Sequence, residues 1–268
     1  MSKPLRIPFD DLATGVHPLP APLARYVSRV HRLRAGARLL LFDPAASTEA
    51  DAELVEGPAP DVWCRVEVPR PSGYRALPIR LIQGLGKADK PDEVIRAATA
   101  LGAARITLVH TDRSVARPLG ERAAGRLDRW RRIAIEAARQ SGRGDVPTLE
   151  GPLELAVALP SANAPWRIVL AADAPPLFER LVAWPPSAAL EHGAASERSA
   201  ALELLVGPEG GLDEAEQLAA AAAGFLPASL GATTLRTELA GVAALGALVA
   251  LSAMSRLGHP APHNTIKA

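Results

Sequence analysis

From residue 78 onward, short apolar runs alternate with segments of helical character. Four runs are rich in aliphatic residues, as strands buried on both faces are: residues 78–83, 105–110, 166–171 and 202–206. The segment 91–101 begins with Pro and two acidic residues and stops at Gly102, and the segment 122–140 is long and basic, so both are expected to be helices. Such alternation predicts an α/β domain with a mostly parallel sheet and helices on both faces.

The first 70 residues show a different pattern. Residues 38–42 form an aliphatic strand signal closed by Asp43-Pro44, and residues 62–68 alternate apolar and polar side chains. The stretch 45–60 is acidic and rich in Pro and Ala, so we expect a loop there. We therefore predict a small β-rich domain over 1–70, a linker over 71–77, a second domain over 78–256 and a disordered tail over 257–268.

Composition narrows the classes of protein. The net charge of +1 gives no overall cationic field that would attract nucleic acid. The single cysteine, Cys64, excludes an intrachain disulfide and suits a reducing compartment, where we expect it in a strand as a small hydrophobe. No secretory leader is visible, and the longest apolar run, 239–254, is shorter than the roughly 20 residues that span a bilayer. We expect a cytoplasmic protein without a membrane partner or a metal.

A turn made almost entirely of Gly and Pro follows the last predicted strand. It consists of Val206, Gly207, Pro208, Glu209, Gly210 and Gly211. In parallel sheets, ligands bind beyond the carboxyl ends of strands, and glycines allow close backbone approach. A phosphate loop is excluded because the spacing is not that of a dinucleotide fingerprint, no Lys-Ser/Thr follows, and Glu209 and the acidic start of the next helix occupy the place of an anion. The turn predicts a ligand such as an adenosine with a cationic centre.

A second loop follows further along the chain. It contains Leu230-Gly231 and ends in Leu235-Arg236-Thr237-Glu238. The helix that starts there is rich in Ala and Gly and apolar all round, which predicts burial. Its small residues allow close contact with loops or with a second subunit.

These two loops together resemble the paired signatures of SPOUT methyltransferases, and most closely those of the RsmE family. Other segments of the chain agree with that resemblance: Lys87-Ala88-Asp89-Lys90, Arg113-Ser114-Val115, residues 136–143 with Val146-Pro147, and, at the N-terminus, residues 31–36 and 41–43. The resemblance implies a PUA-like RNA-binding β-barrel followed by a methyltransferase domain with a deep trefoil knot. It also implies a homodimer that methylates N3 of a uridine in 16S ribosomal RNA, as free RNA or within the assembled small subunit.

The cofactor that the resemblance implies is S-adenosylmethionine. The residues that the resemblance assigns to its pocket are Leu170, Ala171, Val206, Gly207, Pro208, Glu209, Gly210, Gly211, Leu230, Gly231, Leu235 and Arg236. Two departures from the family pattern are visible: Leu239 replaces a Thr, and Asp43-Pro44 replaces Asp-Gly before a stretch, 45–52, that reads as irregular. The first removes one hydrogen bond near the cofactor, and the second predicts altered RNA contacts.

Three residues are candidates for catalysis, each with a structural alternative. Arg236 would stabilise the uracil oxygens or hold a phosphate, or else pair with Glu238 or Glu209. Glu238 would be the base, or would cap its helix. Glu136, with Gln140, Ser141 and Arg143, would frame the uridine entrance, although Glu136 and Gln140 also suit a surface i,i+4 pair. His110, at a strand end, is expected to be a neutral histidine with satisfied hydrogen bonds rather than a base.

RNA recognition is expected from a basic segment near the N-terminus. The candidates are Arg6, Arg25, His31, Arg32, Arg34 and, nearer the active site, Arg143. A solvated basic face is the alternative. Two other functions remain open: a different SPOUT activity, such as ribose 2′-O-methylation, and a catalytically inactive ribosome-assembly protein. A dinucleotide-dependent oxidoreductase lacks its fingerprint here.

Overall fold

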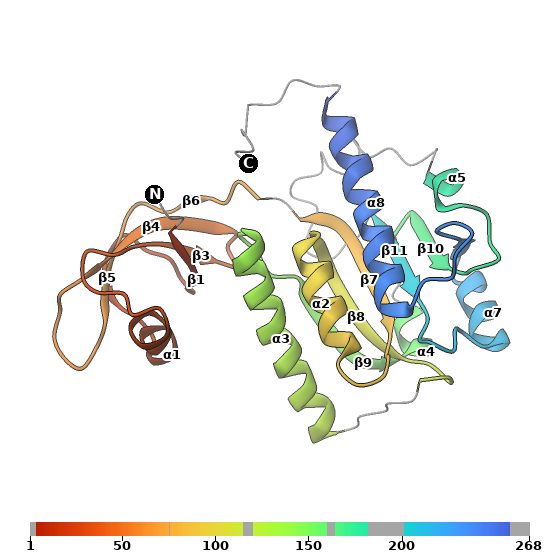
Figure 1. The fold of residues 1–268 in the computed structure, drawn as a ribbon, viewed down its shortest axis with the longest axis horizontal. Coiled ribbons are helices and arrows are strands. Elements are labelled where there is room, and N and C mark those ends of the chain that lie inside the picture. Colours follow the sequence, from red (N-terminus) through yellow and green to blue (C-terminus); the bar gives the residue numbers. More distant parts are fainter. Residues whose placement is uncertain (1–3, 75, 115–119, 160–163, 182–200, 258–268) are drawn as a thin grey trace. The chain divides into compact units, whose positions relative to one another are not determined.

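The computed structural model describes residues 4–74, 76–114, 120–159, 164–181 and 201–257 (Figure 1). Its contacts divide the chain into two compact units. The first comprises Met1–Arg75 together with Ile135–Val146, and the second Ala76–Ala134 together with Pro147–Ala268. A short segment from the middle of the chain therefore packs with the N-terminal unit. The expected tail and Val115 lie outside the described residues, apart from Leu257.

The first unit is built on a mixed sheet in the order β1-β3-β4-β5-β2, with β6 paired to β4. β1 runs parallel to β3, and the other pairs are antiparallel. The alternate side chains Leu39 and Leu41 enter the core, where Cys64 is also fully buried, as expected. The strands are β1 (Leu5–Pro8), β2 (Gly15–Pro18), β3 (Arg38–Asp43), β4 (Thr48–Val55), β5 (Trp63–Val66) and β6 (Arg70–Pro71).

The expected loop at 45–60 is wrong, because half of it is strand β4. β3 and β4 form a regular antiparallel hairpin in which Asp43 faces Thr48. The carboxylate of Asp43 accepts hydrogen bonds from the N–H groups of Ala45 and Ala46 at 2.9 and 3.0 Å, so it closes the turn. In β4, Ala50, Ala52 and Leu54 point into the core. The strand was missed because its Ala and acidic residues have low β-propensity.

In the basic segment that carries Arg25, His31, Arg32 and Arg34, residues 21–30 are helical. They form α1 (Ala21–Arg25) and a π-helical turn, η1 (Tyr26–Val30). Val27 anchors it in the core of the first unit, while most of its other side chains face solvent.

The second unit contains a parallel sheet in the order β12-β10-β11-β7-β8-β9. Every described pair is parallel, which confirms the predicted α/β class. β9 and β12 were not predicted. The strands are β7 (Leu77–Gly84), β8 (Ala103–His110), β9 (Thr148–Glu154), β10 (Trp166–Leu170), β11 (Leu202–Val206) and β12 (Leu226–Ala228).

Helices cover both faces of this sheet (Figure 1). On one face lie α2 and α8, and on the other α4 and α7 pack on Ile82, Val109 and Leu205. The boundary between the units falls within α3. The helices are α2 (Lys90–Ala100), α3 (Glu121–Ser141), α4 (Leu155–Ala158), α5 (Leu177–Leu181), α7 (Glu214–Ala222) and α8 (Thr237–Leu257).

The apolar helix α8 is buried on one face only. Gly241, Ala244, Leu245 and Leu248 face the protein, whereas Leu239 is 53% exposed and Ala243 is also exposed. The expectation that the whole helix is buried is therefore wrong for a single chain. Among the described helices, none is long and apolar enough to cross a membrane.

Candidate active site

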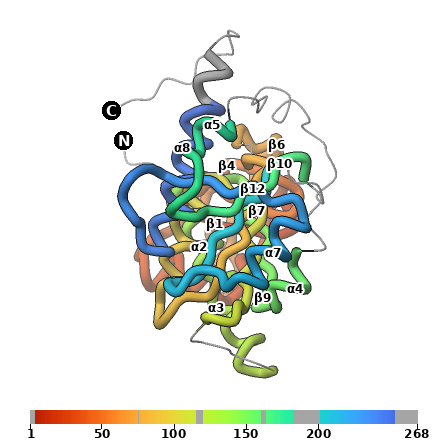
Figure 2. The backbone as a smooth tube through the Cα atoms, turned by 90° about the vertical axis from the view of Figure 1, so that its right-hand side faces the viewer, coloured from red at the N-terminus to blue at the C-terminus, as the bar shows by residue number. Residues whose placement is uncertain are grey.

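Three loops lie at the carboxyl-terminal ends of neighbouring strands in the parallel sheet. They follow β10, β11 and β12, which are neighbours in the sheet; β10 and β12 lie side by side in Figure 2. Because the strands are parallel, their carboxyl ends lie at the same edge of the sheet. The N–H of Ala171 donates to the carbonyl of Ala228 at 2.9 Å, and the N–H of Ser229 donates to that of Pro175 at 2.8 Å, so the first and third loops are fixed to each other.

The glycine-rich turn after β11 is tight and closely packed. The N–H of Gly211 donates to the carbonyl of Pro208 at 2.8 Å. A Cβ on Gly84 would lie 2.6 Å from the nitrogen of Pro208, and one on Gly207 would lie 3.2 Å from the backbone of Gly211. Glycine is needed at these positions because backbone segments contact one another directly.

Two glycines on the same loops face open space. Gly211 has a φ of 70° and Gly231 a φ of 119°, and a Cβ on either would meet no atom within 4 Å. Both conformations favour glycine, and both leave bare backbone exposed. The loops thus leave backbone groups accessible, as a ligand held by backbone groups requires. We refer to the three loops after β10, β11 and β12 as the cradle.

Lys90 joins the glycine-rich turn to the start of α8. Its Nζ lies 3.0 Å from Oε1 of Glu209 and 3.2 Å from Oε2 of Glu238. The same Oε1 accepts a hydrogen bond from the N–H of Lys87 at 3.1 Å. Glu209 therefore serves as the connection between the turn and the start of α2, where Lys90 is the first residue.

The charges of this cluster shift the pKa values of two groups. Burial would raise the pKa of Glu209, but backbone N–H groups of Glu209 and Lys87 and the ammonium of Lys90 lower it below its usual value. Hydrogen bonds to Glu209 and Glu238 raise the pKa of Lys90. Glu209 and Lys90 are therefore both ionised at neutral pH.

Further contacts hold the turn from the sheet side. Oγ1 of Thr237 donates to the carbonyl of Gly207 at 2.5 Å, and Nε2 of buried Gln83 donates to Oγ1 of Thr237 at 2.9 Å. Nη1 of Arg113 donates to the carbonyl of Gly210 at 2.7 Å. The turn is fixed by residues from β7, from the loop after β8 and from α8.

The acidic start of α7 has a structural role. Asp213 accepts from the N–H of Glu216 at 2.7 Å, and Glu216 accepts in return from the N–H of Asp213 at 3.0 Å, which forms a capping box. The second carboxylate oxygen of Glu216 accepts from the N–H of Asp112 at 2.8 Å. Because these carboxylates already occupy the helix N-terminus, an anion cannot bind there.

Arg236 is the last residue of the third loop, directly before α8, and its side chain is exposed. Its carbonyl accepts from the N–H groups of Leu239 and Ala240, both at 2.9 Å, so its backbone starts α8. Within the described part of the chain its guanidinium has no ion-pair partner, and Glu209 and Glu238 pair with Lys90 instead. Leu235 is 36% exposed beside it.

Glu136 belongs to the other unit. It forms an ion pair with Arg139 and accepts from Nε2 of Gln140 at 2.8 Å. These are the contacts that a helix-surface pair makes. Its proposed role at the uridine entrance stays a prediction.

The expected RNA-binding residues divide into two groups. Arg25, His31, Arg32 and Arg34 are exposed. Arg143 is fully buried: its Nε and Nη2 donate to Asp145 at 2.9 Å each, and its guanidinium lies over the ring of Tyr74. Arg6 is 9% exposed, pairs with Glu49 at 3.2 Å and donates to the carbonyl of Arg143 at 2.8 Å. Both side chains are thus engaged within the first unit, and their contacts with RNA stay predictions.

Several site residues were not singled out from the sequence. Lys90, Gln83 and Arg113 hold the glycine-rich turn, although Lys90 and Arg113 lay within segments already noted. Lys90 stands next to Pro91, where a helix was predicted to start. The first turn of a helix favours acidic side chains, so a lysine there indicated a carboxylate partner from another segment of the chain. His110 is buried at the end of β8, but neither of its ring nitrogens has a hydrogen-bond partner among the described residues, so the expectation of a satisfied histidine is wrong.

The comparisons with known proteins point to one family. The family described as an RNA methyltransferase domain matches residues 74–249. The chain is 31% identical over 240 residues to the ribosomal RNA small subunit methyltransferase E of Mycobacterium bovis, covering 85% of this chain and 83% of the relative.

Solved structures agree over nearly the whole chain. The ribosomal RNA small subunit methyltransferase E of Neisseria gonorrhoeae, solved bound to S-adenosyl methionine, has a TM-score of 0.78 at 29% identity and covers 93% of this chain and 98% of its own. A Legionella pneumophila protein solved with bound SAM has a TM-score of 0.81 at 27% identity, with coverage of 93% and 98%. The matched region contains every loop of the cradle, and the chain belongs to the RNA methyltransferase family of ribosomal RNA small subunit methyltransferase E.

Proposed function

We propose that this protein uses S-adenosylmethionine to methylate N3 of a specific uridine in 16S ribosomal RNA of the small ribosomal subunit. The observation that carries the proposal is the cradle at the carboxyl ends of β10, β11 and β12, in which bare glycine backbone faces open space. Its acidic flank disfavours phosphate and suits a cationic nucleoside. Relatives with this fold have been solved with that cofactor bound.

The cofactor would be held largely by backbone groups. Gly210, Gly211 and Gly231 would lie against it, with Leu170, Ala171, Leu230 and Leu235 around it, while Val206, Gly207, Pro208 and Glu209 keep the turn in shape. The bound cofactor supplies an activated methyl group. The task of the protein is then to align the nucleophile and exclude water.

Arg236 is our candidate for the residue that acts on the uracil. Loss of the N3 proton leaves negative charge on the ring oxygens, and a guanidinium without a carboxylate partner is suited to stabilise that charge. Glu238 pairs with Lys90, which supports a positioning role over that of a base. The deep trefoil knot remains part of the proposal.

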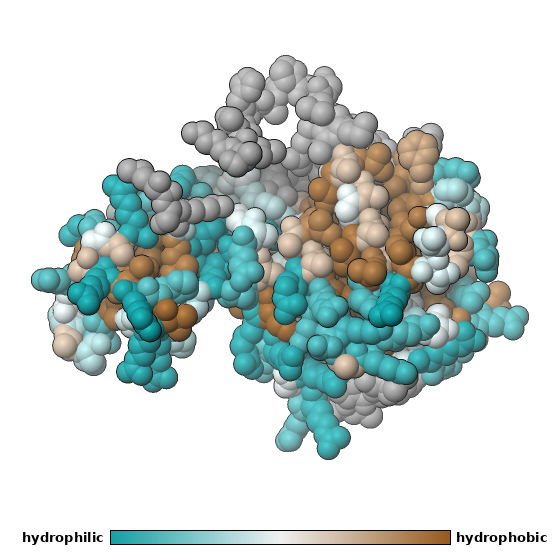
Figure 3. Space-filling model, viewed as in Figure 1, coloured by the Kyte–Doolittle hydropathy of each residue, from teal (hydrophilic) through white to brown (hydrophobic). Residues whose placement is uncertain are grey.

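We further propose a homodimer that acts in the cytoplasm. The apolar stripe on α8 formed by Leu239, Ala243, Ala247 and Ala250 is exposed in the single chain, and Figure 3 shows hydrophobic side chains gathered over this helix. Exposed apolar patches of this kind commonly mark interfaces. RNA would be bound through the exposed Arg25, His31, Arg32 and Arg34.

Nucleoside mass spectrometry of 16S ribosomal RNA tests the proposal. RNA from cells that lack the protein should lose 3-methyluridine at one position, and expression of the intact chain should restore it. Persistence of 3-methyluridine in the deletion would overturn the assignment. Loss of a 2′-O-methyl nucleoside instead would identify the other SPOUT activity.

A further inference from the structure

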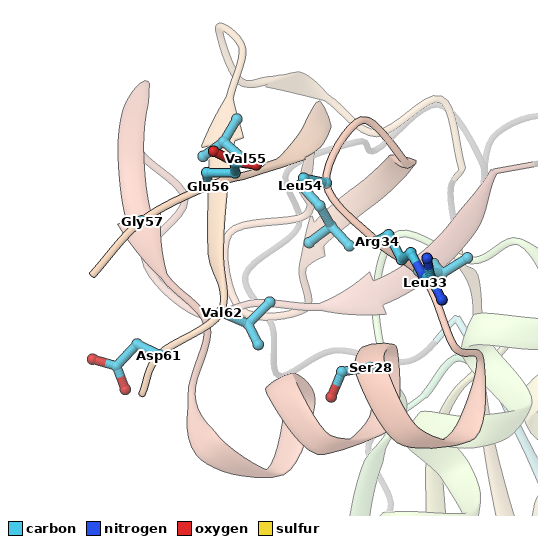
Figure 4. A pocket seen from close by; sticks show the side chains of 10 residues that line it. Ser28, Leu33, Arg34, Leu54, Val55, Glu56, Gly57, Asp61 and Val62 are labelled. Atoms are coloured by element: carbon cyan, nitrogen blue, oxygen red, sulfur yellow. The ribbon is translucent and has the colours of Figure 1, made fainter. Parts of the chain in front are cut away.

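The first unit contains a cavity of about 440 Å³ beside the basic segment (Figure 4). This volume lies within the range of small-molecule sites, about 300–1,000 Å³. Its lining includes the aliphatic side chains of Leu33, Leu54 and Val62, and Ser28 of η1 also lines it. The cavity is thus an open depression with a mixed polar and apolar lining, large enough for a flat ring, on a unit built mainly from β-strands.

One wall of the cavity is basic. Ser28, Leu33 and Arg34 come from the segment that also exposes Arg25, Arg29 and Arg32. None of these arginines has an ion-pair partner among the described residues, so their charge is free for a ligand. The wall also contains unusual backbone: η1 is a π-helical turn, and Arg32 has a φ of 53°. Both features are enriched at functional sites.

The cavity walls are fixed in place. The N–H of Gly36 donates to the carbonyl of Leu54 at 2.8 Å, and the N–H of Leu54 donates to that of Ala37 at 2.9 Å, so the turn after η1 is fixed to β4. On the far side the ring of Trp63 covers Gly57, and its Nε1 donates to the carbonyl of Pro58 at 3.0 Å. A fixed cavity loses little conformational entropy when a ligand binds.

The opposite wall carries the carboxylates of Glu56 and Asp61. In Figure 4 the Asp61 carboxylate points away from Val62, outward at the rim. A nucleic-acid backbone would be repelled from this side and attracted to the arginines on the other. This asymmetry allows only one orientation, with phosphates on the basic wall and the base turned inward.

We propose that the cavity binds one unpaired base of the RNA substrate, against Leu33 and Val62, with Arg34 at its mouth and the adjacent phosphates on Arg25, Arg29 and Arg32. The inference rests on the proposed function, because it takes RNA as the substrate. Single-stranded RNA is commonly recognised through bases that are splayed out of the helix, and guanidinium planes stack on such bases.

Ser28 offers a matched pair of variants for the test. Its side chain is exposed on η1 and donates to the carbonyl of Ala24, so the core does not depend on it. Ser28→Leu should place an aliphatic side chain in the cavity, whereas Ser28→Ala leaves the cavity open. The RNA probe is a 16S fragment carrying single abasic substitutions, and affinity is measured by fluorescence anisotropy with the full chain.

For the wild type and Ser28→Ala, one abasic position should weaken binding by about fivefold to a hundredfold, as loss of one stacked base does. For Ser28→Leu, the intact RNA should already bind that much more weakly, and the same abasic substitution should cost nothing further. Unchanged melting temperatures would show that the variants fold.

The proposal is overturned if Ser28→Leu binds the intact RNA as tightly as Ser28→Ala does. It is also overturned if every abasic substitution weakens RNA binding by Ser28→Leu as much as it weakens binding by Ser28→Ala. Those outcomes leave methyl transfer at saturating RNA intact, so they do not touch the proposed activity. If the wild type forms no 3-methyluridine but one abasic position still distinguishes Ser28→Leu from Ser28→Ala, the proposed activity is refuted and the base-binding role of the cavity stands.

Discussion

Nζ of Lys90 lies 3.2 Å from Oε2 of Glu238, so an ion pair connects the first residue of α2 with the second residue of α8. The same ammonium holds Glu209 at 3.0 Å. Glu238 has a 10% exposed side chain and Lys90 a 27% exposed one, so water screens the pair only partly. A single cation thus sets the position of the glycine-rich turn relative to α8.

Lys90→Met should weaken S-adenosylmethionine binding by about threefold to tenfold, because two carboxylates then repel each other across the gap. Lys90→Arg should retain most of the affinity, since a guanidinium can reach both partners. Isothermal titration calorimetry measures the effect. Equal affinities for Lys90→Met and the wild type would show that the bridge does not position the turn.

Acid should weaken the same contact. The folded protein lowers the pKa of Glu209, so its stabilising contribution is present above the unfolded pKa of about 4.3 and is lost as the pH falls through the folded value. The melting temperature of the wild type should exceed that of Glu209→Gln by a constant amount above about pH 5, and the difference should shrink at lower pH. A difference that grows on acidification would contradict the lowered pKa.

Gly84→Ala should impair the cradle although residue 84 is not in it. The new Cβ would lie 2.6 Å from the nitrogen of Pro208, so the turn must move, and we expect cofactor affinity to fall at least about tenfold. Gly125→Ala on α3 is the control, because its Cβ meets no atom within 4 Å. That variant should be more stable by about 0.5–1 kcal/mol and bind the cofactor normally. Calorimetry and urea unfolding report the two effects separately.

Arg236→Ala should lower the single-turnover methylation rate by about 10²- to 10³-fold, the usual cost of removing one donor that stabilises developing charge. Cofactor affinity should change little, because backbone groups hold the cofactor. Arg122→Ala, at an exposed position on α3, is the control and should react at the normal rate. A near-native rate for Arg236→Ala would remove this residue from the mechanism.

Cys64 should be chemically inert in the folded protein. Burial raises the pKa of its thiol to about 11, and the side chain is fully buried in β5. At pH 8 a thiol-specific reagent should react at least about 100-fold more slowly with the native chain than with the unfolded chain. Rapid native labelling would show that the first unit opens readily.

Local pattern predicted most elements of the second unit. Apolar runs and helix-start signals are properties of neighbouring residues, so the strands β7, β8, β10 and β11 and the helices α2, α3 and α8 were anticipated. β4 was not, because Ala50, Ala52 and the acids between them form a strand only when a partner hairpin strand and a core are present.

Side-chain roles depended on partners distant in the sequence. The sequence alone does not distinguish the roles of Lys90, Arg143 and Arg236, because all three are basic residues within recognisable motifs. Only the fold buries Arg143 against Asp145 and Tyr74, places Lys90 between Glu209 and Glu238, and leaves Arg236 exposed at the end of the third loop. Composition and spacing were enough to locate the two loops and to suggest their ligand. Burial and partners distant in the sequence decided the role of each charged side chain, because the free energy of a charged group depends on its surroundings more than on its residue type.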